Sequence, residues 1–375
     1  MPVDADAVVV APDKFKGSLT AEQAAAALAR GLASVRPAVP VRRVPVADGG
    51  DGTVLAALAA GFEPVEVEVT GPTGGRILAR FAVRDDLAVV ETASACGLVL
   101  LNGHTEPMAA TSEGVGDLLV AAVKHGCRRV MLGVGGSACT DGGAGMLRAL
   151  GARLWTRAGS PAPGGGGLLD LAGVDMSTVD PDVRALDLVL ASDVDNPLLG
   201  EHGAAAVFGP QKGASGEQVR ELERGLENWA GLVERDLGER ARDQPGAGAA
   251  GGIGFAALAV LGAARRDGIE LVLDLTGFED AARGARLVIT GEGSLDEQSL
   301  RGKAPIGVVS AARRLGVPAV AVAGVCRLDP DRLREAGIAA AYALTDLEPD
   351  PARSIAEADS LLERLAARIA EEWLT

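Results

Sequence analysis

The stretch GVGGSACTDGGAGML, residues 133–147, decides how the surrounding chain folds. It follows the apolar run Val130-Met131-Leu132, which is typical of a buried strand, and it leads into residues 144–150, which have the pattern of a helix start. A glycine loop between a strand and a helix lets backbone N–H groups approach an anion, and the helix N-terminus adds partial positive charge. The stretch therefore predicts a phosphate-binding loop, with an ordinary tight turn as the alternative. Asp141 suits such a loop only if a cation lies between its carboxylate and the phosphate.

The composition limits the class of protein. At 375 residues the chain is long enough for two domains, and its hydrophobic content of 48% is that of a globular protein. No apolar run reaches the roughly 18 residues of a membrane span, and the N-terminal segment carries acids where a signal peptide has basic residues. We therefore expect a cytoplasmic protein with no membrane partner. The net charge of −15 argues against nucleic acid as a partner, and the four cysteines lack the spacing of a zinc site.

The two ends of the chain share one pattern, in which a short apolar strand is followed by a polar loop and a helix. Residues 6–11 form the first such strand, and Thr20 with Gln23 predicts a capping box at the start of the next helix. From Val65 the pattern changes to the period-two alternation of antiparallel strands. The same strand and helix pattern as at the start returns after residue 283.

We therefore predict an α/β protein of two domains. Residues 1–64 and 283–375 are expected to form a Rossmann-like domain, a parallel sheet with helices on both faces, and residues 65–282 an inserted second α/β domain with a mixed sheet. The active site is expected in the cleft between the two domains. The segment 111–155 fits either domain.

Two glycine motifs raise the alternative of an NAD-dependent hydroxy-acid dehydrogenase. Residues 133–138 match G-x-G-x-x-G/A, and residues 246–251 match its strict form. A dinucleotide site also needs a preceding strand and an acid about 20 residues later, and neither copy has both. The motifs of P-loop and protein kinases are absent as well. A module that binds a nucleotide or an organic acid without catalysis is the other alternative.

Lysines and carboxylates recur in the glycine loops. Only five lysines occur among 36 basic residues, and four of them lie in loop-like segments: Lys14, Lys16, Lys212 and Lys303. A compact ammonium binds phosphate as a point charge, whereas carboxylates bind magnesium or orient an attacking hydroxyl. The sequence therefore contains the components of a phosphoryl-transfer site.

Six blocks together resemble the type 1 glycerate kinase family. They are APDKFKGSLTAEQAA, VADGGDGT, GVGGSACTDGGAGML, SDVDNPLLGEHGAAAVFGPQKGAS, PGAGAAGGIGF and VITGEGSLDEQSLRGKAP, in this order over nearly the whole chain. The resemblance implies a kinase that phosphorylates D-glycerate and uses ATP and Mg²⁺. It also implies an active site between two α/β domains.

The chemistry of the loops assigns expected roles. The catalytic residues are expected to be Asp193, as base or orienting group, with Lys16 and Asp48. The residues expected to bind substrate are Lys14, Lys16, Ser18, Asp51, Asn196 and Lys212. Those expected to bind ATP are Gly135, Gly136, Ser137, Thr140, Gly142, Gly143, Gly291, Gly293, Ser294 and Lys303. The expected Mg²⁺ ligands are Asp141, Glu292 and Asp296.

Three questions stay open at the level of sequence. The motifs do not distinguish the 2-hydroxyl of glycerate from the 3-hydroxyl, although the resemblance favours 2-phosphoglycerate as product. They do not separate the carboxylate that acts as base from those that bind metal. They are compatible with a monomer or a homodimer.

Overall fold

A computed structural model describes residues 6–159 and 164–375 of the chain. The chain forms two compact units. Unit 1 comprises Met1–Asp48, Leu55–Gly61 and Ile269–Thr375, and unit 2 comprises Gly49–Val54 and Phe62–Gly268. The segment 111–155 therefore belongs to unit 2.

Unit 1 contains a five-stranded parallel sheet. Its strands, in spatial order, are β13 (Ala341–Ala343), β12 (Ala319–Cys326), β11 (Leu287–Leu295), β1 (Val8–Pro12) and β2 (Val41–Arg43). The central strands are apolar because both faces of the sheet are covered, and every residue of β1 is buried. Parallel strands all end at one edge of the sheet, so the loops after β1 and β11 meet there.

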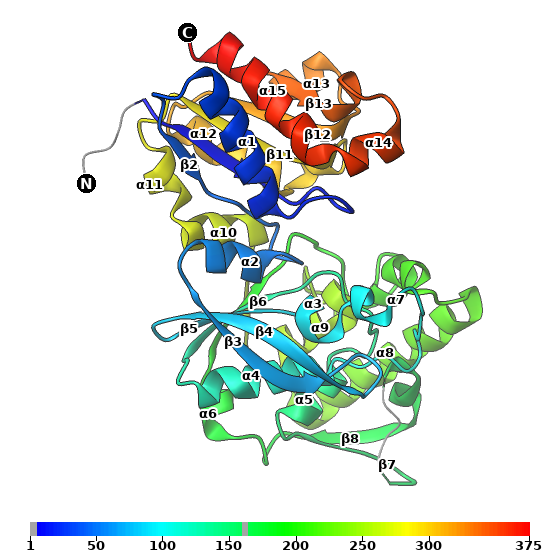
Figure 1. Cartoon of the computed structure of the whole chain (residues 1–375). Coiled ribbons are helices and arrows are strands. Elements are labelled where there is room, and N and C mark those ends of the chain that lie inside the picture. The colour runs from blue at the N-terminus through cyan, green and yellow to red at the C-terminus, as the bar shows by residue number, and fades with distance from the viewer. Residues whose placement is uncertain (1–5, 160–163) are drawn as a thin grey trace. The chain divides into compact units, whose positions relative to one another are not determined.

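Two helices from opposite ends of the sequence cover one face of this sheet. They are α1 (Ala21–Val35) and α15 (Ala358–Trp373), which lie side by side in Figure 1. The predicted capping box begins α1, because the Thr20 hydroxyl accepts the N–H of Gln23 and the Gln23 side chain accepts the N–H of Thr20. Gly31 lets the helices approach closely, since a Cβ there would lie 2.1 Å from the carbonyl oxygen of Glu363.

Within the residues that the structure describes, four further α-helices belong to unit 1, and two helices have residues that belong to both units. Those in unit 1 are α11 (Phe278–Ala282), α12 (Ala304–Arg314), α13 (Pro330–Glu335) and α14 (Pro351–Ala356). Helices α2 (Thr53–Ala59) and α10 (Gly268–Thr276) each have residues in both units.

Unit 2 is built on a six-stranded mixed sheet. Its strands, in spatial order, are β10 (Ala264–Arg266), β9 (Asp187–Ala191), β6 (Arg129–Gly133), β5 (Leu87–Glu91), β4 (Arg76–Arg84) and β3 (Glu63–Thr70). The first four are parallel, and β4 is antiparallel to both of its neighbours. A separate pair joins β7 (Arg153–Thr156) to β8 (Leu171–Asp175).

The core of unit 2 includes the largest fully buried side chain of the described residues, Trp229, together with Phe81 and Phe255. The helices of the unit are α3 (Ala93–Cys96), α4 (Glu113–Lys124), α5 (Ala144–Ala149), α6 (Pro181–Arg184), α7 (Ala204–Phe208), α8 (Gly216–Leu237) and α9 (Ala249–Ala259). The long helix α8 packs on the β7–β8 side of the unit, as Figure 1 shows.

The predicted α/β class, with one parallel and one mixed sheet, is confirmed. Several boundaries differ from the prediction. The apolar pattern predicts a strand over residues 287–290 followed by a loop at 291–296, whereas β11 continues to Leu295. It also predicts a strand over residues 41–46, whereas β2 ends at Arg43. The helical periodicity predicts one terminal helix over residues 354–373, whereas the structure has two helices, α14 and α15, which meet at Glu357. No helix in the described ranges has both the length and the apolar composition that crossing a membrane requires.

Candidate active site

In unit 1, acidic and basic side chains gather where β1 and β11 end. Asp13 directly follows β1 and is only 7% exposed, and its backbone N–H donates to the carbonyl oxygen of Gly291 at 2.8 Å. Burial raises the pKa of Asp13 to about 7; the Lys14 ammonium opposes this rise, whereas the carboxylates of Asp48 and Glu292 add to it. The charge of Asp13 therefore interacts with those of Lys14, Asp48 and Glu292.

Glu292 lies within β11 and is 8% exposed. Burial raises the pKa of Glu292, and the charges of Asp296 and Asp48 add to this rise. A hydrogen bond from Ser299 and the charge of Lys303 oppose it. Its Oε1 atom has no hydrogen-bond partner among the described residues. A buried, unsatisfied carboxylate oxygen is costly, so this atom is suited to accept a proton or a cation.

The carboxylate of Asp296 accepts hydrogen bonds from residues two positions away in the sequence. Its Oδ1 accepts the N–H of Gln298 at 2.9 Å, and its Oδ2 accepts the hydroxyl of Ser294 at 3.1 Å. Burial alone would raise the pKa of Asp296, but these hydrogen bonds and the charge of Lys303 together hold it below its usual value. Asp296 is therefore an ionised carboxylate beside Lys303, the residue that precedes α12.

The loop after β1 lies along β11. A Cβ at Gly293 would come within 3.2 Å of the backbone nitrogen of Lys16, so this glycine permits the close approach. The Lys16 residue is exposed, and the hydroxyl of Ser18 donates to the carbonyl oxygen of Phe15 at 3.0 Å. The structure thus brings together most of the site residues predicted from the two ends of the chain.

In unit 2, two glycine loops touch through their backbones. A Cβ at Gly133 would lie 2.4 Å from the carbonyl oxygen of Gly49, and one at Gly135 would lie 2.9 Å from the Cα of Gly50. Within residues 133–145 the exposed or half-buried positions are Gly135 and Gly136 only. A ligand of this loop can therefore contact only Gly135 and Gly136, which lie beside Asp51.

The carboxyl end of β5 connects these two loops. Oε2 of Glu91 accepts backbone N–H groups from Gly52 at 3.0 Å, Thr53 at 2.9 Å and Val54 at 3.4 Å. The next residue, Thr92, donates its hydroxyl to the carbonyl oxygen of Gly135 at 3.0 Å. Burial raises the pKa of Glu91 to about 7 and the charge of Asp51 adds to the rise, whereas the three N–H groups oppose it.

Lys212 lies under the glycine loop of residues 133–145. It is 2% exposed, and its Nζ donates to the hydroxyl of Ser137 at 3.0 Å and to the carbonyl oxygen of Cys139 at 2.5 Å. Burial lowers its pKa, and no carboxylate within the described ranges forms an ion pair with it. These contacts favour a role in supporting the loop over the predicted direct contact with substrate.

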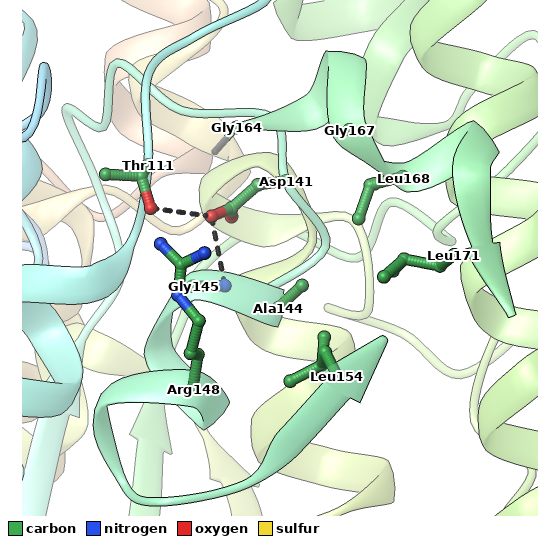
Figure 2. A pocket seen from close by; sticks show the side chains of 10 residues that line it. All are labelled: Thr111, Asp141, Ala144, Gly145, Arg148, Leu154, Gly164, Gly167, Leu168 and Leu171. Atoms are coloured by element: carbon green, nitrogen blue, oxygen red, sulfur yellow. Dashed lines mark hydrogen bonds between the residues drawn. The ribbon is translucent and has the colours of Figure 1, made fainter. Parts of the chain in front are cut away.

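The start of α5 differs from the predicted phosphate cradle. Asp141 is 1% exposed and accepts N–H groups from Ser112, Gly143 and Gly145, and the hydroxyl of Ser112 accepts the N–H of Met146. Figure 2 shows the hydrogen bonds that join the Asp141 carboxylate to the Thr111 hydroxyl and to the N–H of Gly145. The N–H groups that would bind a phosphate are thus already occupied by the protein itself.

The contacts within this loop count against three of the predicted roles. Gly142 and Gly143 are buried against other side chains and leave no room for a nucleotide. A Cβ at Gly142 would lie 2.5 Å from the ring of Trp229, and a Cβ at Gly143 would lie 2.5 Å from the Cβ of Ala256. The Asp141 carboxylate anchors the loop to Ser112, so its contacts count against a role as metal ligand. Thr140 is fully buried, which likewise counts against a contact with ATP.

Asp193 and Asn196 follow β9 in unit 2. Oδ1 of Asp193 accepts the N–H of Gly268 at 2.6 Å, and the Asn196 amide donates to the carbonyl oxygen of His202 at 2.8 Å. Both residues are partly exposed. Since β5, β6 and β9 are parallel, Asp193 lies at the same edge of the sheet as Glu91 and the glycine loop.

Comparison with known proteins identifies the family. The model of the glycerate kinase family matches residues 8–374. The chain belongs to the glycerate kinase family. A protein named glycerate kinase from Halalkalibacterium halodurans is 44% identical over 97% of both chains, and one named glycerate 2-kinase from Escherichia coli is 41% identical over 90% of both. A crystal structure named as a glycerate kinase 2 from Salmonella typhimurium LT2 matches with a TM-score of 0.84 and 39% identity, over 98% of both chains.

This membership confirms the resemblance seen in the six sequence blocks. Glycerate kinases are enzymes that transfer a phosphoryl group, so the dehydrogenase and the non-catalytic module are no longer needed as interpretations. These relatives match nearly the full length of this chain, and both units therefore belong to the architecture of the family.

Two buried carboxylates of the candidate site were missed in the sequence. Asp13 directly follows an apolar strand and Glu91 ends another, and the carboxyl ends of strands are where open α/β sheets bind ligands. Their location at strand ends was a signal from which both could have been predicted as candidate site residues. No group of three or more His, Cys, Asp or Glu side chains in the described parts of the chain is arranged to hold a metal ion.

Proposed function

We propose that this protein is an ATP-dependent D-glycerate 2-kinase, which forms 2-phosphoglycerate and ADP. The observation that carries the proposal is the cluster at the ends of β1 and β11, where Lys14 and Lys303 lie with Asp13, Asp48 and Glu292 in a member of the glycerate kinase family. Phosphoryl transfer needs cations at the phosphates and carboxylates for a metal or an attacking hydroxyl. The name of the Escherichia coli relative supports transfer to the 2-hydroxyl.

The proposed roles follow the chemistry of each side chain. Lys14, Lys16 and Lys303 neutralise the transferring phosphate and the substrate carboxylate, and Ser18, Asp51 and Asn196 offer hydrogen bonds to glycerate. Asp193 is the proposed base or orienting group, with Asp48 as the other candidate. ATP is proposed to contact the backbone at Gly135 and Gly136, beside Ser137, and the Gly291–Ser294 part of β11.

The residues of unit 1 fit a magnesium ion that arrives with ATP. Mg²⁺ is usually held by one or two carboxylates, substrate phosphates and water, so a preformed set of three protein ligands is not required. Glu292 and Asp296 are the proposed carboxylates, because Oε1 of Glu292 is buried without a hydrogen-bond partner in the described residues. The ion would supply charge neutralisation at the phosphates.

A coupled assay tests the proposed function. The protein is incubated with ATP, Mg²⁺ and D-glycerate, and ADP release is followed. Addition of enolase without a mutase then produces phosphoenolpyruvate only if the 2-hydroxyl was phosphorylated. Absence of ADP release would contradict the kinase assignment, and ADP release without the enolase product would assign the 3-hydroxyl. The cytoplasmic location and the choice between monomer and homodimer remain predictions.

A further inference from the structure

Glu91 is a buried carboxylate to which the proposed reaction assigns no chemical step. One of its oxygens binds three consecutive backbone N–H groups, those of Gly52, Thr53 and Val54. These are N–H groups at the start of α2, which have no partner within the helix. A carboxylate satisfies them with charge-assisted hydrogen bonds, which are stronger than neutral ones.

Thr92 makes the matching connection to the other loop. Its hydroxyl donates to the carbonyl oxygen of Gly135 at 3.0 Å and accepts the N–H of Gly135 at 3.3 Å. Its own N–H donates to the carbonyl oxygen of Gly133 at 2.9 Å. Two neighbouring residues at the end of β5 therefore bind the backbones of two different glycine loops.

The two loops would otherwise be costly to order. Residues 49–54 contain three glycines and residues 133–136 contain three, and glycine loses more conformational entropy on ordering than any other residue. If a ligand had to order the loops, that cost would be subtracted from its binding free energy. Hydrogen bonds from a rigid strand remove the cost before the ligand arrives.

We propose that Glu91 and Thr92 are positioning residues, which hold the loops of residues 49–54 and 133–138 as one preformed surface for the reactants. The kinetic part of this inference rests on the proposed function, because it takes glycerate and ATP as the ligands. Neither side chain contacts a reactant in this proposal; each acts through the loop that it holds.

Substitutions of Glu91 test the first connection. Glu91→Met keeps the length of the side chain and removes the acceptor, so the KM for glycerate should rise at least tenfold. At saturating substrate the loop is ordered by the ligand, and kcat should stay within threefold of the wild-type value. Glu91→Gln keeps an oxygen that can accept the same N–H groups, and should keep the KM within threefold.

Substitutions of Thr92 test the second connection and serve if Glu91→Met does not fold. Thr92→Val keeps the shape of the side chain and removes both bonds to Gly135, so the KM for ATP should rise at least fivefold. Thr92→Ser keeps the hydroxyl and should restore the wild-type KM. A folded Thr92→Val enzyme with a changed kcat and unchanged KM values would contradict the proposal.

Amide hydrogen exchange tests the same idea without an activity measurement. In ligand-free Glu91→Met, the amides of residues 52–54 should exchange at least tenfold faster than in the wild type, and in Glu91→Gln they should not. The matched control is Asp117→Ala, which removes a carboxylate that binds the N–H and hydroxyl of Thr70, a residue of neither loop, at 2.7 and 2.9 Å. It should leave both KM values and the exchange of residues 52–54 unchanged.

The outcomes separate this proposal from the proposed function. Wild-type exchange in Glu91→Met would overturn the positioning role, and so would a Glu91→Gln enzyme as impaired as Glu91→Met. A wild-type protein that does not phosphorylate glycerate would end the proposed function, whereas the exchange experiment would still decide whether Glu91 holds the loop.

Discussion

Lys16 is the most accessible test of the proposed chemistry at the scale of single residues. It is exposed in the loop after β1, so Lys16→Ala should leave folding intact. Loss of one cation at the transferring phosphate is expected to cost on the order of 2 to 4 kcal/mol of transition-state stabilisation, a fall in kcat/KM of roughly 30- to 900-fold. Lys124→Ala on the exposed face of α4 is the control. A change smaller than about threefold would remove Lys16 from the site.

Asp193 tests the base or orienting role. Asp193→Asn keeps an oxygen that can accept the N–H of Gly268, so the loop after β9 should keep its structure. The loss of charge and basicity should lower kcat about 100-fold or more, in steady-state assays at saturating substrates. Asp187→Asn, at the exposed other end of β9, should have normal kcat. Near-normal turnover of a folded Asp193→Asn enzyme would exclude the role.

The raised pKa of Glu91 predicts how stability depends on pH. Its pKa is about 7 in the folded protein, mainly because of burial, against an ordinary value of 4.5. The folded state thus binds more protons between these values. The contribution of Glu91 to stability is complete below pH 4.5 and is lost as pH rises through about 7. The loss amounts to roughly 3 kcal/mol at most.

Glu91→Gln does not titrate and should lack this loss. Urea unfolding of the wild type and of Glu91→Gln at pH 5 and pH 8 measures the effect. The difference in unfolding free energy should shift in favour of Glu91→Gln at pH 8. A difference that is the same at both pH values would show that Glu91 keeps an ordinary pKa in the folded protein.

At the scale of elements, the start of α5 leads to a prediction about Asp141. Asp141→Asn loses charge-assisted bonds to buried N–H groups of Ser112, Gly143 and Gly145. We expect unfolding to become easier by roughly 2 to 3 kcal/mol, because the buried donors lose a charged acceptor. The Mg²⁺ concentration needed for half-maximal activity should stay unchanged.

Thermal unfolding and a magnesium titration measure these two effects. Asp180→Asn is the control, because Asp180 caps α6 at the surface by accepting the N–H of Asp182. Its effect on stability should stay near or below 1 kcal/mol. If Asp141→Asn instead needs much more Mg²⁺ at normal stability, the metal role first expected from the sequence would be reinstated.

The elements show how far a sequence predicts this site. Apolar runs and the capping box at Thr20 were sufficient for the strands and for α1, because these depend on residues close in the sequence. The loops that end parallel strands were predicted for the same reason. The partners of the loop N–H groups were not predictable, since Glu91 is 37 to 39 positions away in sequence from residues 52–54. The continuation of β11 to Leu295 was not predictable either, because Gly291 and Gly293 within it are typical of a loop.

At the scale of the whole molecule, the change of pattern at Val65 was sufficient to predict an α/β chain with an interrupted first sheet. The exact path was not predictable, because residues 49–54 and 55–61 belong to different units although they adjoin in sequence. Tertiary packing decides which unit a segment belongs to, and a local sequence pattern contains no information about that packing. The same holds for the close approach of α1 to α15 at Gly31.

The pairing of β1 with β11 has a consequence for synthesis of the chain. Partner residues in these strands, such as Ala11 and Thr290, are 279 positions apart. At about 5–20 residues per second, the ribosome needs roughly 14 to 56 s between the two strands. Throughout this time the apolar strand β1 lacks its central neighbour, and residues 62–268 of unit 2 are synthesised within the same interval. The nascent chain is therefore expected to depend on chaperones that shield the first strand until translation reaches the last hundred residues.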